Sequence, residues 1–480
     1  MKTKLFFSMQ ILFFIMILNL LSSCVTTSNS KSKNNEINES VFYQNYKKNT
    51  INTKLSNGIK VVINNNPNSK MNTISIYFET GASTLENDKS GLANLTLDMM
   101  TSESKHFSFE NKTKLLDSKL ATLDYTASSV FSSITITSLT KYFSVVFPVF
   151  KDAILNPEFS NFENEISGKK FSLENISKKD LNLLTELANN DLRNKTNFLG
   201  KNNLTLESIN KITKKDLENF YQSLFTKNSI YILCSGKFET KIFLKELEKS
   251  FGKIKLTENK NHQKFIYQFD SSLVEFNKNE NKLIDYAISY SNLPEATDNS
   301  FVSSYLAILM YSDLLHNIVR EQNGSCYSVG TNINLCNKPF FTTLGYRISN
   351  KEKFFEGIKQ AKEILKSKNT ISSKLEAPEN NNEFILIPVE EKLENYKNKL
   401  INSLYANTST SKEKVFLMIQ GLTLSNSTDF MFQLENKIQQ VTKESLYEAI
   451  DILMSNNEQW YYLTGVKYPE SSLERIISFK

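Results

Sequence analysis

Two side chains seven residues apart, Arg320 and Tyr327, form the first group in this sequence that could take part in chemistry. A guanidinium and a phenol are strong hydrogen-bond donors, and together they can stabilise an oxyanion as it develops. Gly324 lies between them and would permit a tight turn from a helix into a strand. The alternative is a structural role, in which the arginine pairs with a glutamate at a helix end and the tyrosine is half-buried.

A second polar group lies on a predicted helix with the sequence Gly91-Leu-Ala-Asn-Leu-Thr-Leu-Asp-Met-Met100. Asn94 and Asp98 are four positions apart, so they share one face of that helix. Two histidines at this spacing could bind one zinc ion, whereas an amide and a single carboxylate are poor zinc ligands. Leu97 lies beside them and can neither accept nor donate a proton. The spacing is that of a catalytic metal helix, but the functional groups are missing.

The other residues give no substitute for these ligands. The chain has three histidines, and none lies within four residues of another: His106, His262 and His316. A harder metal held by oxygen atoms of Asp98, Glu174 and Asn94 is an alternative, although a proton acceptor would still be lacking. A simpler explanation is that the helix packs in the core, because three apolar residues form a stripe along it: Leu92, Leu95 and Met99.

The predicted helix resembles the catalytic segment of the insulinase/pitrilysin family of zinc metallopeptidases. In that family a Gly-Leu-Ala-like start leads into an H-x-x-E-H helix. The resemblance aligns the two histidines with Asn94 and Asp98, and the glutamate with Leu97. It aligns the third zinc ligand with either Glu174 or Asn175. This resemblance therefore implies that the chain holds no metal, contributes no catalytic residue and is inactive alone.

The same family carries a segment similar to Arg320-Glu-Gln-Asn-Gly-Ser-Cys-Tyr327. By resemblance, Arg320 and Tyr327 bind backbone carbonyls of the substrate beside the scissile bond. Some family members divide the site between two subunits, of which one carries zinc and the other carries this pair. We therefore expect the substrate-positioning subunit of a heterodimeric peptidase, with zinc in a homologous partner and unfolded peptides as substrates. Two alternatives stay open: a non-enzymatic, chaperone-like peptide-binding protein of the envelope, and a self-sufficient peptidase with unusual ligands.

A repeated unit predicts the architecture. Residues 213–236 and 442–465 each begin with a threonine that can cap a helix, continue into a strand and end on a glycine at the same spacing. Strands followed by helices in each half predict an α+β fold. The resemblance implies two such related domains, with helices packed on a mainly antiparallel sheet, that together form a clamshell.

Composition shifts give the expected boundaries of these domains. The N-terminal peptidase-like domain is expected over residues 46–255, and the C-terminal one, with the Arg/Tyr pair, over 283–480. The polar residues 256–282 are typical of a linker. Residues 366–390 contain two prolines and a run of asparagines, which indicates a surface insertion.

The N-terminus indicates export and lipidation. Residues 1–23 have a positive start and a long apolar stretch, as in a signal peptide. They end in Leu-Ser-Ser before Cys24, which resembles the lipobox of bacterial lipoproteins, so Cys24 is the expected acylation site. Residues 24–45 are mostly small and polar and are expected to form a tether. These features predict a lipid-anchored membrane protein of the bacterial cell envelope.

The composition is that of a packed globular protein. Of the 480 residues, 40% are hydrophobic and 22% charged, and the net charge of +6 is not gathered in a basic block. We therefore expect no nucleic-acid partner. The three cysteines after Cys24 are expected to be buried, free and small apolar residues: Cys234, Cys326 and Cys336.

Overall fold

The structure is a computed structural model of the chain. It describes residues 39–176, 180–196, 199–258, 269–277, 284–336, 338–371, 385–465 and 475–479. These residues belong to one compact unit, residues 39–480. The expected signal peptide, Cys24 and the first part of the tether lie outside the described residues. Within the described part, no helix combines the length and apolar character needed to cross a membrane.

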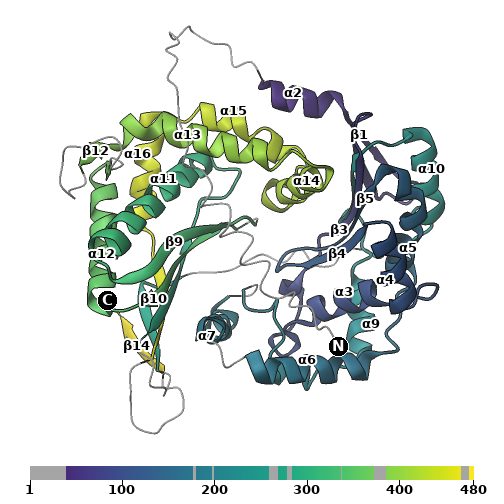
Figure 1. The fold of residues 1–480 in the computed structure, drawn as a ribbon, viewed down its shortest axis with the longest axis horizontal. Helices are drawn as coiled ribbons and strands as arrows, with labels where there is room; N and C mark the ends of the chain where they lie inside the picture. Colours follow the sequence, from purple (N-terminus) through teal and green to yellow (C-terminus); the bar gives the residue numbers. More distant parts are fainter. Residues whose placement is uncertain are drawn as a thin grey trace. The chain divides into compact units, whose positions relative to one another are not determined.

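The first half of the chain builds a six-stranded sheet with the strand order β1-β2-β6-β3-β5-β4 (Figure 1). Its strands are β1 (Thr50–Lys54), β2 (Lys60–Asn65), β3 (Met71–Phe78), β4 (Thr122–Ala127), β5 (Ser132–Leu139) and β6 (Ile230–Gly236). Strands β2 and β6 run parallel, and the other neighbouring pairs are antiparallel.

The second half repeats this arrangement with the order β14-β7-β13-β8-β10-β9. Its strands are β7 (Ser272–Asn277), β8 (Asp285–Asn292), β9 (Cys326–Asn334), β10 (Phe340–Ile348), β13 (Glu458–Thr464) and β14 (Arg475–Phe479). Here β7 and β13 form the parallel pair, in the position of β2 and β6. The expected α+β fold with two related halves and mainly antiparallel sheets is confirmed.

Helices pack on both sheets. Those of the first half are α3 (Leu92–Ser102), α4 (Phe109–Ser118), α5 (Phe143–Leu155), α6 (Phe162–Ile176), α7 (Asp180–Lys195), α8 (Leu206–Ile209), α9 (Lys214–Ser223) and α10 (Thr240–Ser250). Those of the second half are α11 (Ser300–Leu315), α12 (Lys351–Lys366), α13 (Val389–Ala406), α14 (Ser411–Ser425), α15 (Leu434–Gln439) and α16 (Lys443–Ser455).

The repeated unit is the same in both halves. Thr213 caps α9 by accepting a hydrogen bond from the backbone of Asp216, and Thr442 caps α16 in the same way from Ser445. Each helix leads into a central strand, β6 or β13, whose side chains are nearly all buried. Because helix caps depend on local sequence, the sequence alone is enough to predict this unit.

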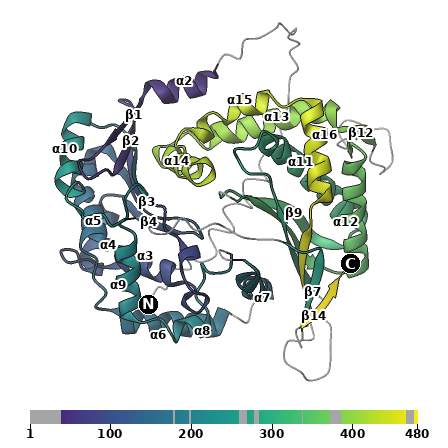
Figure 2. The same ribbon diagram turned by 180° about the vertical axis from the view of Figure 1, so that it is seen from behind.

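One helix from each half also packs against the sheet of the other half. Helix α14 contacts β3 and β6 of the first sheet, and the Oγ of Ser411 donates to the carbonyl oxygen of Met71 at 3.0 Å. Figures 1 and 2 show α14 beside β3 from opposite sides. Helix α7 contacts β8 and β13 of the second sheet, where the Tyr461 hydroxyl donates to Asp191 at 2.8 Å. Strand β3 is buried on both faces as a result.

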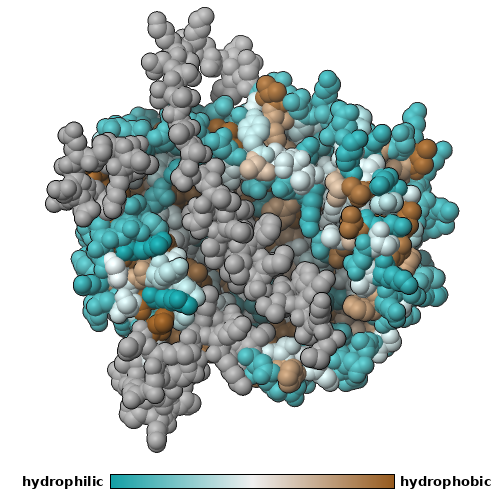
Figure 3. Space-filling model, viewed as in Figure 1, coloured by the Kyte–Doolittle hydropathy of each residue, from teal (hydrophilic) through white to brown (hydrophobic). Residues whose placement is uncertain are grey.

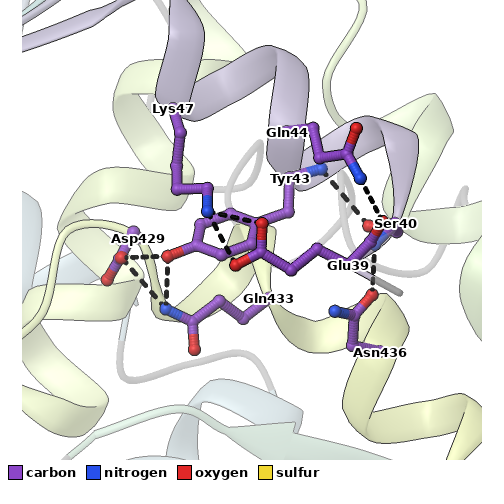
Figure 4. Close-up of polar contacts among 8 residues, drawn as sticks. All are labelled: Glu39, Ser40, Tyr43, Gln44, Lys47, Asp429, Gln433 and Asn436. Carbon is purple, nitrogen blue, oxygen red and sulfur yellow. Dashed lines mark hydrogen bonds and ion pairs between the residues drawn. The ribbon is translucent and has the colours of Figure 1, made fainter. Parts of the chain in front are cut away.

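A short helix at the start of the described chain, α2 (Val41–Lys48), docks on the second half. The Tyr43 hydroxyl donates to Asp429 at 2.7 Å and accepts from Gln433 at 2.9 Å (Figure 4). The ring of Tyr46 stacks on that of Phe432 with 3.7 Å between centroids. The tether expected over residues 24–45 therefore ends earlier, because Val41 already belongs to a helix with buried tyrosines.

Two expected surface segments contain strands. Residues 272–277, inside the expected linker, form β7, whose apolar residues are buried against β13. The second sheet therefore begins before residue 283. The ends of the expected insertion pair as β11 (Asn369–Ile371) and β12 (Leu386–Pro388), and residues 372–384 lie outside the described part.

The three cysteines in the described part of the chain are free, as expected. Cys234 and Cys326 are buried, whereas Cys336 is only half-buried, which corrects its expected burial. On the face shown in Figure 3, hydrophobic residues of the described part form small groups among hydrophilic ones. Most of the apolar side chains instead fill the interior beside the two sheets.

Candidate functional site

Helix α3 carries the three positions of the altered metal motif. It begins after Gly91, whose φ of +81° favours glycine and whose hypothetical Cβ would lie 2.3 Å from the backbone nitrogen of Leu204. Its apolar stripe is buried as predicted: Leu92, Leu95 and Met99 are at most 3% exposed. The helix is therefore fixed on both sides, by a close backbone approach at its start and by core packing along its length.

The proton-acceptor position is part of this core. Leu97 has no exposed surface and belongs to the hydrophobic cluster between the first sheet and its helices. A general base must reach water or substrate to move a proton. A leucine enclosed in this way contributes to packing alone.

The two former ligand positions are half-buried and bind other protein groups. The Tyr125 hydroxyl, from β4, donates to Oδ1 of Asn94 at 3.1 Å. The carboxylate of Asp98 pairs with the ammonium of Lys169, from α6, at 2.5 Å. Burial raises the pKa of Tyr125, and the negative charge of Asp98 raises it further. An ammonium group of the protein thus already pairs with the one carboxylate among the two former ligand positions.

The residues aligned with the third ligand do not join this group. Glu174 and Asn175 are exposed on α6, and Nδ2 of Asn175 donates to the carbonyl oxygen of Phe171 at 2.7 Å. Among the described residues, no three histidine, cysteine, aspartate or glutamate side chains are grouped so that they could hold a metal. The residues at the motif do not fit zinc, and a harder metal there would have to displace Lys169.

A lysine closes the other end of α3. The ammonium of Lys112, from α4, donates to the carbonyl oxygens of Thr101 and Ser102, which are free at the helix end. Burial lowers the pKa of Lys112 to about 8, although Asp98 and Glu103 act in the opposite direction. This lysine was not singled out from the sequence, because only the fold brings α4 to the end of α3.

The second candidate group is assembled where α11 runs into β9. The helix continues as a π-helical segment, η5 (His316–Gln322), and Gly324 then turns the chain with a φ of +56°. The guanidinium carbon of Arg320 lies 5.7 Å from the ring centroid of Tyr327. The structure therefore brings the two predicted residues together, and Gly324 has the predicted role. Single π-helical turns of this kind are frequent at functional sites.

Both residues of the pair face solvent. Tyr327 is 63% exposed, so the half-buried tyrosine of the structural alternative is not observed. Arg320 is oriented by Nε2 of His316, at 3.1 Å from its Nη1, and by Glu321, at 3.4 Å from its Nε. The ion pair of that alternative does exist, but it leaves the phenol hydroxyl and part of the guanidinium able to donate to a ligand.

Arg347 is a member of this group that no sequence pattern singles out. It lies on β10, and its guanidinium carbon is 5.8 Å from the ring centroid of Tyr327. The ring of Tyr346 packs edge-on against that of Tyr327, with 6.3 Å between centroids. Nothing in the surrounding residues indicates the pairing of β10 with β9 that brings Arg347 to this place.

The sequence matches two family profiles over most of these elements. Residues 60–203 match insulinase (peptidase family M16), and residues 211–368 match the peptidase M16 inactive domain. The first match includes α3 and its altered motif, and the second includes Arg320, Tyr327 and Arg347. No curated protein matches the sequence.

Solved structures share the fold at low sequence identity. A protease from Helicobacter pylori has a TM-score of 0.71 at 13% identity, over 86% of this chain and 99% of the other. The peptidase M16 inactive domain from Pseudomonas fluorescens has a TM-score of 0.71 at 14% identity, over 88% and 100%. The periplasmic protease PqqL from Escherichia coli has a TM-score of 0.70 at 15% identity, over 93% of this chain and 49% of PqqL. Profile matches in both halves and a shared two-domain fold thus lead to one conclusion: this chain belongs to the insulinase family, peptidase family M16.

Proposed function

We propose that this protein is the non-catalytic, substrate-positioning subunit of a heterodimeric zinc peptidase. A homologous partner would supply the zinc, and this chain would supply Arg320 and Tyr327. The observation that carries the proposal is a contrast between the two candidate groups. Leu97 is enclosed in the core and Asp98 is neutralised by Lys169, whereas Arg320 and Tyr327 stand together in solvent.

The exposed pair has the chemistry to hold a peptide by its backbone. The Tyr327 hydroxyl and the Arg320 guanidinium are donors, and peptide carbonyl oxygens are acceptors. When one such carbonyl is attacked, its oxygen gains negative charge, and donors already in place stabilise it more than the ground state. Zinc in the partner would activate the attacking water. This chain would then contribute the orientation of the substrate and part of the oxyanion stabilisation.

The relative lengths of the solved relatives support a two-subunit arrangement. The match to PqqL covers nearly all of this chain but only 49% of PqqL, so PqqL is long enough to hold two units of this size. If one such protein joins two units in a single chain, a pair of separate homologous chains can form an equivalent assembly. Oligomers built from homologous surfaces are common in soluble proteins.

The test is to mix the purified chain with its zinc-bearing homologue and to measure cleavage of an unfolded peptide. Neither chain alone should cleave, and the mixture should. Arg320→Ala should reduce kcat/KM by about 10²-fold or more, because removal of one oxyanion donor typically costs that much. Tyr327→Phe removes the hydroxyl alone and should act in the same direction. Lys359→Ala, an exposed position on α12, is the matched control and should leave the rate unchanged.

Two results would contradict the proposal. Wild-type rates from Arg320→Ala would remove the pair from the reaction. Chelator-sensitive cleavage by the isolated chain would revive the self-sufficient peptidase. The chaperone-like function would be favoured if the mixture is inactive but the chain alone binds peptides. The exposed Tyr327 suits that function too, because it can bind a peptide without a partner.

We also propose that the protein works in the cell envelope, anchored by acylation of Cys24. The support is the lipobox-like sequence before Cys24 and the periplasmic location of PqqL, a protein of the same fold. Expression with a clickable palmitate analogue should label the wild type, and Cys24→Ala should abolish the label. Equal labelling of both proteins would exclude this cysteine as the anchor.

A further inference from the structure

Arg347 faces Tyr327 across two paired strands. Strand β10 pairs with β9 so that Tyr346 is opposite Ser328 and Ile348 is opposite Cys326, which leaves Arg347 opposite Tyr327. Directly opposed residues in an antiparallel pair are close enough for their side chains to interact. The guanidinium carbons of Arg347 and Arg320 both lie within 6 Å of the Tyr327 ring centroid, at 5.8 and 5.7 Å. Two guanidinium groups therefore lie close to the ring of one exposed tyrosine.

The backbone at Arg347 is held in an uncommon conformation. Its φ is +53°, a left-handed value that favours glycine. At the same point the register of β10 against β8 shifts, because Tyr346 pairs with Tyr286 while Ile348 pairs with Asp285. Such a bulge redirects one side chain, and strained residues of this kind concentrate at ligand-binding sites. Folding alone gives no reason for an arginine here, since glycine would adopt the turn without strain.

Among the described residues, Arg347 has no carboxylate partner. Its contacts in this part of the chain are the rings of Tyr327 and Tyr346. Asp285, opposite Ile348 on the neighbouring strand β8, already accepts from the Tyr462 hydroxyl and from the backbone N–H of Gly465. Glu321 lies with Arg320. Because Glu321 already pairs with Arg320, Arg347 is the guanidinium of this group that lacks an anionic partner among the described residues.

We propose that Arg347, together with Arg320, binds a carboxylate of the peptide whose backbone lies at Tyr327. This proposal rests on the peptide-binding function argued above and adds the substrate class, which is acidic peptides. A guanidinium presents a planar fork of donors that fits a carboxylate, and charge-assisted hydrogen bonds are the stronger ones. The carboxylate is either the C-terminal group of the peptide or a glutamate side chain. The first would indicate capture of peptide ends, and the second would indicate selection of acidic sequences.

The test uses fluorescence anisotropy with the full chain and four short labelled peptides of one apolar sequence. The peptides combine a central glutamate or glutamine with a C-terminal acid or amide. The wild type should bind at least one of the acidic peptides about ten-fold more tightly than the peptide that has both glutamine and amide. The preferred peptide identifies which carboxylate is bound. Added salt should weaken this preference, because it screens exposed charges.

The variants separate this proposal from the one on which it rests. Arg347→Gln should remove the preference for acidic peptides, so that acidic and neutral peptides bind this variant with equal affinity. Arg347→Lys should keep part of the preference, and Lys359→Gln, with the same change of net charge, should keep all of it. If Arg320→Ala abolishes binding but acidic and neutral peptides bind the wild type equally, only the carboxylate site is overturned. If no peptide binds the wild type, the carboxylate site is overturned, whereas the proposed subunit role is decided separately by the cleavage assay of the mixture.

Discussion

Replacing Leu97 by glutamate would restore the residue that the motif lacks, and the structure predicts that the protein will not tolerate it. The side chain has no exposed surface, and its helix α3 packs against β4, β5, α5 and α9. A glutamate there would enter a cluster of hydrophobic side chains. In an active family member the glutamate at this position acts on the zinc-bound water. The loss of stability caused by Leu97→Glu therefore measures how completely position 97 is enclosed in the core of this chain.

The size of the penalty follows from two contributions. Loss of the buried leucine removes about 2–3 kcal/mol of apolar burial. A carboxyl group in an apolar site stays protonated, and holding it neutral at pH 7 against an ordinary pKa of about 4.3 costs about 3.7 kcal/mol. The total is about 6 kcal/mol at pH 7. At pH 5 the second contribution falls to about 1 kcal/mol, because the unfolded chain is then closer to protonation.

The sign of the pH dependence is therefore fixed. Burial raises the folded-state pKa of the introduced glutamate, so Leu97→Glu should be less unstable at pH 5 than at pH 7, by about 2.7 kcal/mol. Calorimetric unfolding of the wild type, Leu97→Glu, Leu97→Gln and Leu97→Met at both pH values measures this. Leu97→Gln controls for polarity without ionisation, and Leu97→Met, a change of shape alone, should cost less than about 1.5 kcal/mol. A Leu97→Glu protein as stable as the wild type at both pH values would refute the reasoning, because position 97 would then be open to a working base.

Three further changes test other parts of the structure. Tyr43→Phe removes the hydroxyl that joins Asp429 and Gln433; it should destabilise the docked α2 by about 1–2 kcal/mol and speed hydrogen exchange of its amides about ten-fold or more. Lys112 has a folded pKa of about 8 and an ordinary value of 10.5, so the unfolded chain binds more protons between these pH values. The free energy of unfolding should therefore rise from pH 8 to 10.5, by up to about 3 kcal/mol more than in Lys112→Met, as read from urea titrations. Arg347→Gly relieves the left-handed φ and should raise the unfolding free energy by about 1 kcal/mol while it weakens binding of acidic peptides.

The repeated architecture could be predicted because its signals are local. Thr213 and Thr442 each cap a helix through a residue three positions later, and each helix leads into an apolar strand. Such a unit depends on neighbouring residues alone. The family resemblance added the sheet and the domain pairing, which no single segment encodes.

Other features depend on contacts between distant segments, and the sequence could not provide them. Strand β7 was expected to be linker because polar residues surround its short apolar core, and its partner β13 lies far along the chain. The packing of α7 and α14 on the sheet of the opposite half was not predicted for the same reason, because each helix contacts strands that are distant in the sequence. Helix α14 is apolar on most sides because it packs both on its own half and on the first sheet, a pattern that indicates burial without naming the partner.

The candidate residues divide in the same way. Arg320 and Tyr327 were identifiable because they lie on one continuous segment. Lys169 was not, since its ion pair with Asp98 joins α6 to α3. Arg347 was not, because its position depends on a bulge and on strand register.

The two candidate groups differ in what they contribute to folding, and this difference is the strongest physical argument for the proposed role. At α3 every change from a metal site favours the folded state: Leu97 adds buried apolar surface, and Lys169 neutralises Asp98. Around Tyr327 the arrangement adds less to folding, because the aromatic ring is exposed and Arg347 has a left-handed φ. Glycine at position 347 would adopt this φ at lower cost. An exposed and strained group of donors is what the proposed peptide binding requires, because the carbonyl and carboxylate oxygens of a peptide would accept hydrogen bonds from it.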